Sequence, residues 1–265
     1  MLVSFITPTY KRLKYIKKNL KSFERLHKIF NNFEWVVVAE KDDLSTIKFL
    51  KKKNKKFIKL KIGIFKNVEK AVTAGIKKSN GNYVNFHGDD DFFEEKNFKF
   101  IKKNLFKSDV KWIIFHGGYV NSKYKEIRKI ISFTKFFLLK NYQIFDLSLI
   151  NYLMTPSIFV KKNIFSKFGG FGSTKRSVSD YRLWLKIYNV YEPKIYPYKL
   201  TYAMINQNTI TGNFVLERYI FQTCLMLKYS KLKITKFLII IIMSAVIIYN
   251  FITKSFSFKT NNPRN

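Results

Sequence analysis

The chain of 265 residues is long enough for one sizeable α/β domain with an appendage and short for two full domains. Its 47% hydrophobic and 18% aromatic residues exclude a disordered chain. The net charge of +33 favours polyanionic partners, namely anionic lipid head groups, phosphorylated substrates or nucleic acid. A solvated surface of scattered lysines is the alternative interpretation of that charge.

The first ninety residues alternate between predicted strands and helices. Apolar runs and alternating patterns predict strands over 2–6, 35–39, 58–62 and 83–86, and helical spacing predicts helices over 13–23 and 68–76. This order predicts a Rossmann-like, doubly wound, mostly parallel α/β sheet, in which ligands bind beyond the carboxyl ends of the strands. The opening residues lack the basic start and long apolar core of a signal peptide, so we expect this part in the cytoplasm.

The second half of the chain has fewer regular patterns. We predict a helix over 98–105, strands over 110–115 and 157–160, and a helix from Ser179 or Asp180 to Tyr188. Residues 121–151 are expected to form a loop and helices rich in aromatics, placed where an acceptor could dock. The single cysteine, Cys224, excludes a disulfide framework and is expected to be buried in its apolar stretch.

The C-terminal region, 213–265, is predicted to be helical and to carry a hydrophobic membrane helix over about 237–253. That segment contains no charge and is flanked by Lys236 and Lys254. Its length is near the lower limit for crossing a bilayer, so it either spans the membrane or lies in the interface. A buried core helix is the third interpretation.

Three consecutive aspartates, Asp89, Asp90 and Asp91, follow the strand predicted over 83–86. Clustered carboxylates repel one another and are costly unless a cation lies between them. Hard oxygen ligands suit Mg²⁺ or Mn²⁺, and such an ion in turn holds a diphosphate. The triplet therefore predicts a metal site, with an exposed acidic turn or a helix cap as the alternative.

Other candidates lie at strand ends or helix starts. Asp180, where a helix is predicted to begin, is a candidate general base or, alternatively, a helix cap. Trp184, one turn later, either packs under an acceptor sugar or fills the core. Glu40 ends the second predicted strand, where a carboxylate can accept hydrogen bonds from a base or ribose. Tyr10 can stack on a base.

These residues resemble four motifs of the family 2 glycosyltransferases with the GT-A fold, in the family's order from residue 2 to about residue 190. Residues 3–12 resemble the first strand and its Pro-Thr-Tyr-Asn-Arg loop, and residues 34–40 resemble the second strand with its acidic end. Residues 75–91 resemble the run that leads to the metal-binding Asp-x-Asp motif. Phe168-Gly169-Gly170-Phe171, Ser179-Asp180 and Leu183-Trp184-Leu185 resemble the acceptor-side motif.

The resemblance implies a GT-A catalytic domain over 1–212 and a metal-dependent glycosyltransferase, inverting as is usual in the family, that uses a nucleotide sugar and Mn²⁺ or Mg²⁺. By resemblance Asp90 and Asp91 would hold the metal, Asp180 would be the base and Trp184 would bind the acceptor. The nucleotide-sugar site would comprise Thr7, Pro8, Tyr10, Arg12, Glu40 and Asp89.

Five residues depart from the family's pattern. They are Ala39, the pair Val72-Thr73, Gly88 and Ser179. Because Gly88 stands where the family has its first Asp, the metal motif reads either as Asp89-x-Asp91 or as Asp90 alone. The change at Ser179 leaves Asp180 as the only carboxylate of its motif.

We therefore expect transfer from a nucleotide-sugar donor, a UDP-sugar being favoured, to a glycan or lipid-linked acceptor in cell-envelope polysaccharide or lipopolysaccharide synthesis. The basic surface and apolar tail imply attachment to anionic membrane at the cytoplasmic face of the inner (plasma) membrane, with no nucleic acid partner. A nucleotidyltransferase with an Asp-bound metal and a non-enzymatic basic membrane- or nucleic-acid-binding protein are the alternatives.

Overall fold

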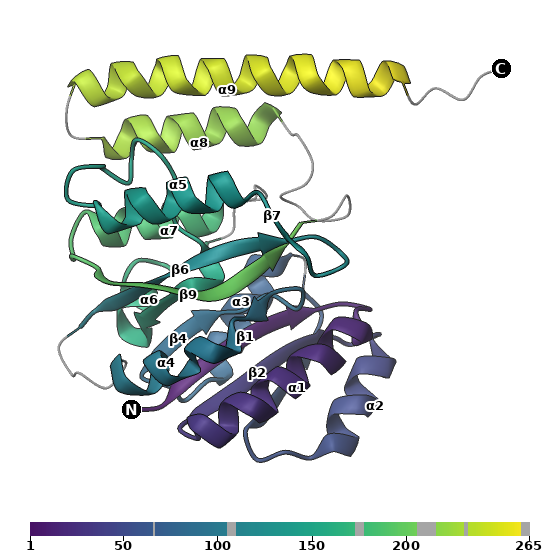
Figure 1. The fold of residues 1–265 in the computed structure, drawn as a ribbon. Coiled ribbons are helices and arrows are strands. Elements are labelled where there is room, and N and C mark those ends of the chain that lie inside the picture. The colour runs from purple at the N-terminus through teal and green to yellow at the C-terminus, as the bar shows by residue number, and fades with distance from the viewer. Residues whose placement is uncertain (66, 105–109, 173–177, 206–215, 231–232, 261–265) are drawn as a thin grey trace.

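The computed structural model describes residues 1–65, 67–104, 110–172, 178–205, 216–230 and 233–260. Its N-terminal half is a parallel sheet with helices on both faces (Figure 1). The strands are β1 (Val3–Thr9), β2 (Phe33–Glu40), β3 (Ile58–Gly63) and β4 (Tyr83–Phe86), and the helices are α1 (Leu13–Ile29), α2 (Leu44–Lys53) and α3 (Val68–Lys78). Within this half the predicted strands and helices are confirmed, and α2 is an additional helix.

The second half extends the same sheet with strands of both directions. Its strands are β5 (Phe92–Phe93), β6 (Trp112–Val120), β7 (Glu126–Ile127), β8 (Ile158–Lys161) and β9 (Lys194–Met204). The strand order is β3-β2-β1-β4-β8-β6-β9-β5, with β7 paired to β6. Because β8 runs antiparallel to both β4 and β6, the sheet is mixed beyond β4, whereas β6 and β9 are parallel.

The helices of the second half are α4 (Phe98–Asn104), α5 (Lys129–Lys140), α6 (Lys162–Lys167), α7 (Ser179–Tyr188), α8 (Leu216–Tyr229) and α9 (Lys233–Thr260). Two short 3₁₀ turns, η1 (Glu95–Asn97) and η2 (Thr155–Ser157), precede α4 and β8. The helix predicted from Ser179 is confirmed, and residues 121–151 contain β7 and α5.

Two apolar cores lie on opposite faces of the sheet because successive strand residues point to opposite sides. Phe5 of β1 is buried on the face covered by α1, where its ring meets Phe23 and Phe33 edge-on. Ile6 is buried on the other face, against α3 and α7. Burial of each side chain of this size stabilises the fold by about 1.5–3 kcal/mol. This free energy keeps Phe5 on the α1 face of the sheet and Ile6 on the opposite face.

The C-terminal helices form a layer of their own. Helix α8 lies between α7 and α9, and α9 lies at the edge of the molecule (Figure 1). Ile239 and Met243 of α9 are buried in the same cluster as Leu225 and Met226 of α8. Cys224 is exposed, contrary to our expectation, because its neighbours Leu225 and Met226 are the ones that turn inward. The domain boundary predicted at 212 lies outside the described residues.

Among the helices of the described residues, none has both the length and the apolar character required to cross a membrane. The spanning interpretation of 237–253 is therefore not confirmed. The uncharged run lies on a helix whose residues Ile239 and Met243 pack against protein, while Phe237 and Ile241 are exposed.

Candidate active site

A cavity of about 940 Å³ opens at the carboxyl ends of β1, β2 and β4. Its walls bring together most of the residues selected from the sequence, which lie far apart along the chain. They are Pro8, Tyr10, Arg12, Glu40, Asp89, Asp90, Asp91 and Asp180. The edge predicted to bind ligand is therefore hollowed.

Arg12 lies against the acidic triplet. Its Nη1 atom donates to Asp89 Oδ1 at 2.7 Å and to Asp90 Oδ2 at 2.9 Å. The hydroxyl of Thr9 at the end of β1 donates to Asp89 Oδ2 at 2.8 Å, and the Asn19 amide of α1 donates to the Asp89 carbonyl. The first strand and helix thus fix Asp89 and supply one positive charge to two carboxylates.

Asp91 turns back toward its own loop. Its Oδ2 accepts the backbone N–H of Gly88 at 2.7 Å. A Cβ atom at position 88 would lie only 2.7 Å from that same oxygen, so the carboxylate occupies space that only glycine leaves open. The glycine at position 88 therefore allows the Asp91 carboxylate to take this position.

Burial makes ionisation of this cluster costly. It raises the pKa of Asp89 to about 6, although the charge of Arg12 opposes the shift. Burial also raises the pKa of Asp91 well above its usual value, and the negative charge of Asp90 adds to that rise. The guanidinium of Arg12 contacts Asp89 and Asp90, so ionisation of Asp91 gains no such contact.

Substitution of Asp91 by asparagine is expected to raise the melting temperature of the metal-free protein at pH 7.5 by a few degrees. Because the folded-state pKa of Asp91 is raised, the folded state retains a proton that the unfolded chain has already released above about pH 4. Stability is consequently lost as pH rises, and asparagine removes this loss while keeping an oxygen for the Gly88 N–H. Thermal unfolding of both proteins in EDTA between pH 4.5 and 8 measures this difference in melting temperature.

The variant should also show a shallower fall in melting temperature with pH, since one carboxyl group fewer has a raised pKa, while Asp89 and Asp180 still contribute. Each kcal/mol corresponds to about 2–4 °C for a domain of this size. A lower melting temperature than wild type at pH 7.5 would show that the Asp91 carboxylate stabilises the fold.

The carboxylates of the Asp89–Asp91 triplet fit a divalent metal whose other ligands are substrate phosphates and water. In the described part of the chain, no three His, Cys, Asp or Glu side chains form a group that would hold a metal ion by themselves. Mg²⁺ and Mn²⁺ are commonly held by one or two carboxylates together with substrate phosphates and water. Asp90 and Asp91 are adjacent in the chain and line the same cavity, so they fit that arrangement.

One side of the cavity is formed by the ends of β1 and β2. The Tyr10 ring is half exposed, and its hydroxyl donates to Asp42 Oδ2 at 2.9 Å. Both carboxylate oxygens of Glu40 accept the backbone N–H of Phe65, at 3.2 and 3.1 Å. Asp42 is a cavity residue that our sequence analysis missed, although its place just after β2 is the same signal that selected Glu40.

Thr7 lies outside the cavity, contrary to its assignment to the nucleotide-sugar site. Its side chain is fully buried, and its Oγ1 accepts the indole N–H of Trp35 at 2.9 Å. Thr7 has the same strand parity as Val3 and Phe5, which face α1, whereas Pro8 faces the cavity.

Asp180 begins α7 and lines the cavity wall. The Thr155 hydroxyl donates to Asp180 Oδ2 at 2.5 Å, and the Tyr181 N–H donates to Asp180 Oδ1 at 2.7 Å. Burial raises the pKa of Asp180, while these hydrogen bonds and the charge of Lys135 act in the opposite direction. A carboxylate that lines a cavity in this way can accept a proton from a group bound there.

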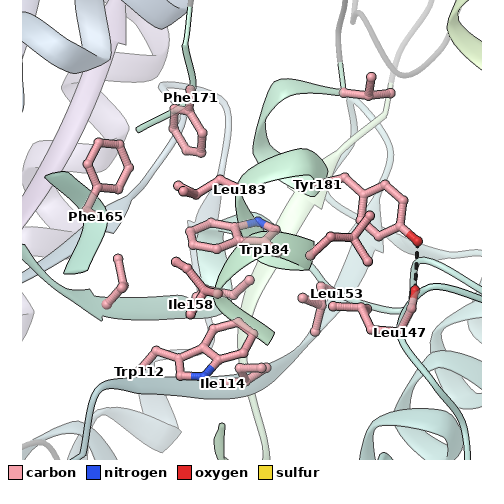
Figure 2. Packing of buried hydrophobic residues seen from close by; sticks show 14 of the residues in the cluster. Trp112, Ile114, Leu147, Leu153, Ile158, Phe165, Phe171, Tyr181, Leu183 and Trp184 are labelled. Atoms are coloured by element: carbon pink, nitrogen blue, oxygen red, sulfur yellow. Dashed lines mark hydrogen bonds between the residues drawn. The ribbon is translucent and has the colours of Figure 1, made fainter. Parts of the chain in front are cut away.

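Trp184 does not line the cavity. It is 2% exposed, and its ring packs beside Trp112 and edge-on to Phe171 within the core (Figure 2). Its Nε1 atom donates to Thr155 Oγ1 at 3.2 Å. Of the two interpretations left open by the sequence, core filling describes this position, and direct contact with an acceptor sugar does not.

The wall of the cavity around Asp180 includes residues that sequence reasoning did not select. Thr155 comes from η2, Lys135 from α5 and Gln222 from α8. Thr155 precedes Pro156, and a Thr-Pro pair at the start of a strand was the only available signal. Nothing in the spacing of Lys135 or Gln222 distinguishes them from surface residues.

The sequence matches the model of the Glycosyl transferase family 2 over residues 4–181, more than half of the chain. The chain belongs to this family. It is therefore a glycosyltransferase, and family membership disfavours the nucleotidyltransferase and non-enzymatic alternatives. No curated protein matches the sequence of this glycosyltransferase.

Solved structures confirm the GT-A architecture of this glycosyltransferase. Residues 1–349 of TarS from S. aureus, in complex with UDP-GlcNAc, superpose with a TM-score of 0.65 at 18% identity, covering 98% of this chain and 74% of that one. The mannosyltransferase PcManGT from Pyrobaculum calidifontis, in complex with GDP-Man and Mn²⁺, gives 0.63 at 14% identity, covering 92% and 69%. At such identities the likeness establishes the fold alone.

Proposed function

We propose that this glycosyltransferase transfers a sugar from a nucleoside-diphosphate sugar, a UDP-sugar being favoured, to a hydroxyl of a glycan or lipid-linked acceptor. The observation that carries the proposal is the shared cavity, in which the Asp89–Asp91 triplet and Asp180 line the same space. One end of such a site holds a diphosphate and the other a hydroxyl, which are the two groups that the reaction requires.

In the proposed reaction, Asp180 accepts the proton of the acceptor hydroxyl. The hydroxyl oxygen then bonds to the anomeric carbon while the bond from that carbon to the diphosphate breaks, and the nucleoside diphosphate leaves. A single displacement with one base inverts the anomeric centre. Arg12, already paired with Asp89 and Asp90, supplies positive charge beside the leaving group.

Asp90 and Asp91 are the residues that would hold Mn²⁺ or Mg²⁺. When bound, the metal offsets the charge that develops on the departing diphosphate. The complex of PcManGT with GDP-Man and Mn²⁺ and that of TarS with UDP-GlcNAc support this choice of metal and donor class.

A donor panel tests the proposal. The protein is incubated with UDP-GlcNAc, UDP-glucose, UDP-galactose and GDP-mannose, each with Mn²⁺ or with EDTA, and thermal stability and release of nucleoside diphosphate are followed. We expect one nucleotide class to raise the melting temperature only with metal, by several degrees at about 100 times its dissociation constant. Absence of any stabilisation or release across the panel would contradict the proposal.

We further propose that α9 attaches the enzyme to anionic membrane at the cytoplasmic face of the inner (plasma) membrane, where envelope polysaccharide or lipopolysaccharide is assembled. Exposed apolar side chains on α9, among them Phe237 and Ile241, accompany exposed lysines Lys233 and Lys236. A helix with exposed apolar side chains and basic residues suits the interface of an anionic bilayer.

Vesicle co-sedimentation tests this attachment. The wild type should sediment with phosphatidylglycerol vesicles, less so at high salt, and poorly with phosphatidylcholine. The double variant Phe237→Ser/Ile241→Ser should lose most of the bound fraction, whereas Ile64→Ser, which removes an exposed apolar side chain elsewhere, should retain it. Equal sedimentation of the two variants would exclude α9 as the attachment site.

A further inference from the structure

We propose that Thr155 and Trp184 are positioning residues, which orient the Asp180 carboxylate through a chain of hydrogen bonds that begins in the core and ends in the cavity. The Trp184 indole donates to Thr155 Oγ1 at 3.2 Å, and the Thr155 hydroxyl donates to Asp180 Oδ2 at 2.5 Å. This inference rests on the proposed function, in which Asp180 is the general base, and gives the buried Trp184 a role without sugar contact.

The direction of the chain follows from the donors available. An indole N–H can only donate, so it occupies a lone pair of the Thr155 oxygen and leaves the single hydroxyl proton for Asp180. The Tyr181 N–H holds the other carboxylate oxygen, Oδ1, at 2.7 Å. With one donor on each oxygen, the carboxylate has a fixed plane before substrate arrives, which a base needs for a well-aligned proton transfer.

Thr155 is held by the centre of the sheet. It begins η2, and the amide of Asn85 on β4 donates to the carbonyls of Pro156 and Ile158, at 2.9 and 2.8 Å. Asn85 is itself 1% exposed. These hydrogen bonds hold the backbone that directly follows Thr155, and so limit the movement of Thr155 as a whole.

Trp184 is equally fixed. Its ring centroid lies 6.3 Å from that of Trp112 and 5.9 Å from that of Phe171, with the Phe171 ring edge-on (Figure 2). The indole N–H of Trp112 points elsewhere and donates to the Tyr191 carbonyl at 3.0 Å. Trp112 is thus a matched control, since it shares the packing of Trp184 and takes no part in the chain.

The chain also affects the charge of the base. Burial raises the pKa of Asp180, and it is lowered by the Thr155 hydroxyl of η2, the backbone N–H groups of Tyr181 and of Asp180 itself in α7, and the Lys135 ammonium of α5. Without the Thr155 hydroxyl, fewer groups oppose the effect of burial on the pKa of Asp180. Asp180 would then keep its proton to a higher pH, and a smaller fraction of the enzyme would carry an ionised base at neutral pH.

The test compares Thr155→Val and Trp184→Phe with Thr155→Ser and Trp112→Phe. Aspartate labelled with ¹³C at the carboxyl gives eight signals, of which Asp180 is assigned by its loss in Asp180→Asn. Thr155→Val should raise the pKa of Asp180 by about one unit and Trp184→Phe by less. Thr155→Ser and Trp112→Phe should titrate as wild type. The acid limb of kcat/KM, measured with the donor that the panel selects, should move in parallel.

Two results would overturn the inference. One is a wild-type titration of Asp180 in Thr155→Val, and the other is an equal effect of Trp184→Phe and Trp112→Phe, which would make Trp184 a packing residue only. The failure of the proposed function looks different. There, Asp180→Asn would retain wild-type turnover while the carboxyl signal of Asp180 still responded to Thr155→Val.

Discussion

Replacement of Asp180 by asparagine is expected to lower kcat by about 10²–10⁴-fold, because an amide cannot accept the proton of the acceptor hydroxyl. The asparagine carbonyl can still accept the Thr155 hydroxyl but leaves the Tyr181 N–H without its acceptor. Removal of a buried carboxylate, whose pKa burial has raised, offsets that loss. We therefore expect an unchanged or raised melting temperature at pH 7.5, measured beside the initial rate of nucleoside diphosphate release.

Asp146→Asn is the control for this substitution. Asp146 accepts the N–H of Ser148 and does not line the cavity, so its loss of charge should leave kcat near wild type. If Asp180→Asn kept wild-type kcat with an intact fold, the proton would have to leave through another group, and Asp180 would be a helix-capping residue only.

Substitution of Asp90 by alanine is expected to abolish the stabilisation that nucleotide gains from Mn²⁺. Wild type at about 100 times the dissociation constant should gain about 2.7 kcal/mol, which corresponds to several degrees. The variant should keep only the metal-independent part, since Asp90 is a predicted metal ligand and its charge already acts on both Arg12 and Asp91. Loss of metal assistance should reduce kcat by about 10³-fold.

Isothermal titration with Mn²⁺ in the presence of nucleotide measures the metal affinity apart from turnover. Asp146→Ala again serves as the control and should bind metal as wild type does. Metal-dependent stabilisation of full size in Asp90→Ala would move the metal ligand to Asp91 or Asp89, the alternative register that Gly88 leaves open.

The ligand edge of the fold was predictable because it follows from strand order and local pattern. A strand over 83–86 that ends in three aspartates, beside a first strand that ends at Thr9, places both ends at one edge of a parallel sheet. Strand parity within β1 places Thr7 on the face of Phe5, and Thr7 lies inside the strand, whereas Thr9, of the same parity, reaches the cavity at the end of the strand.

The rest of the fold and site could not be predicted, because it depends on contacts between segments that are far apart in the sequence. Thr155 and Asp180 are 25 positions apart, and no periodicity links them. The antiparallel direction of β8 is likewise invisible in its sequence, because an apolar run predicts a strand and not its orientation. Trp184 was predictable only in part. Its helical spacing with Tyr181 and Tyr188 indicated a core position, but the spacing could not reveal its hydrogen bond to Thr155.

The stacking of α9 on α8 has a consequence for how the enzyme meets its acceptor. Gln222 of α8 lines the cavity, and α8 lies directly beneath the proposed membrane helix (Figure 1). A lipid-linked acceptor would therefore reach the base after a search confined to two dimensions, with its anchor never leaving the bilayer. The water-soluble donor would instead enter the cavity from the aqueous phase, at the ends of β1 and β2.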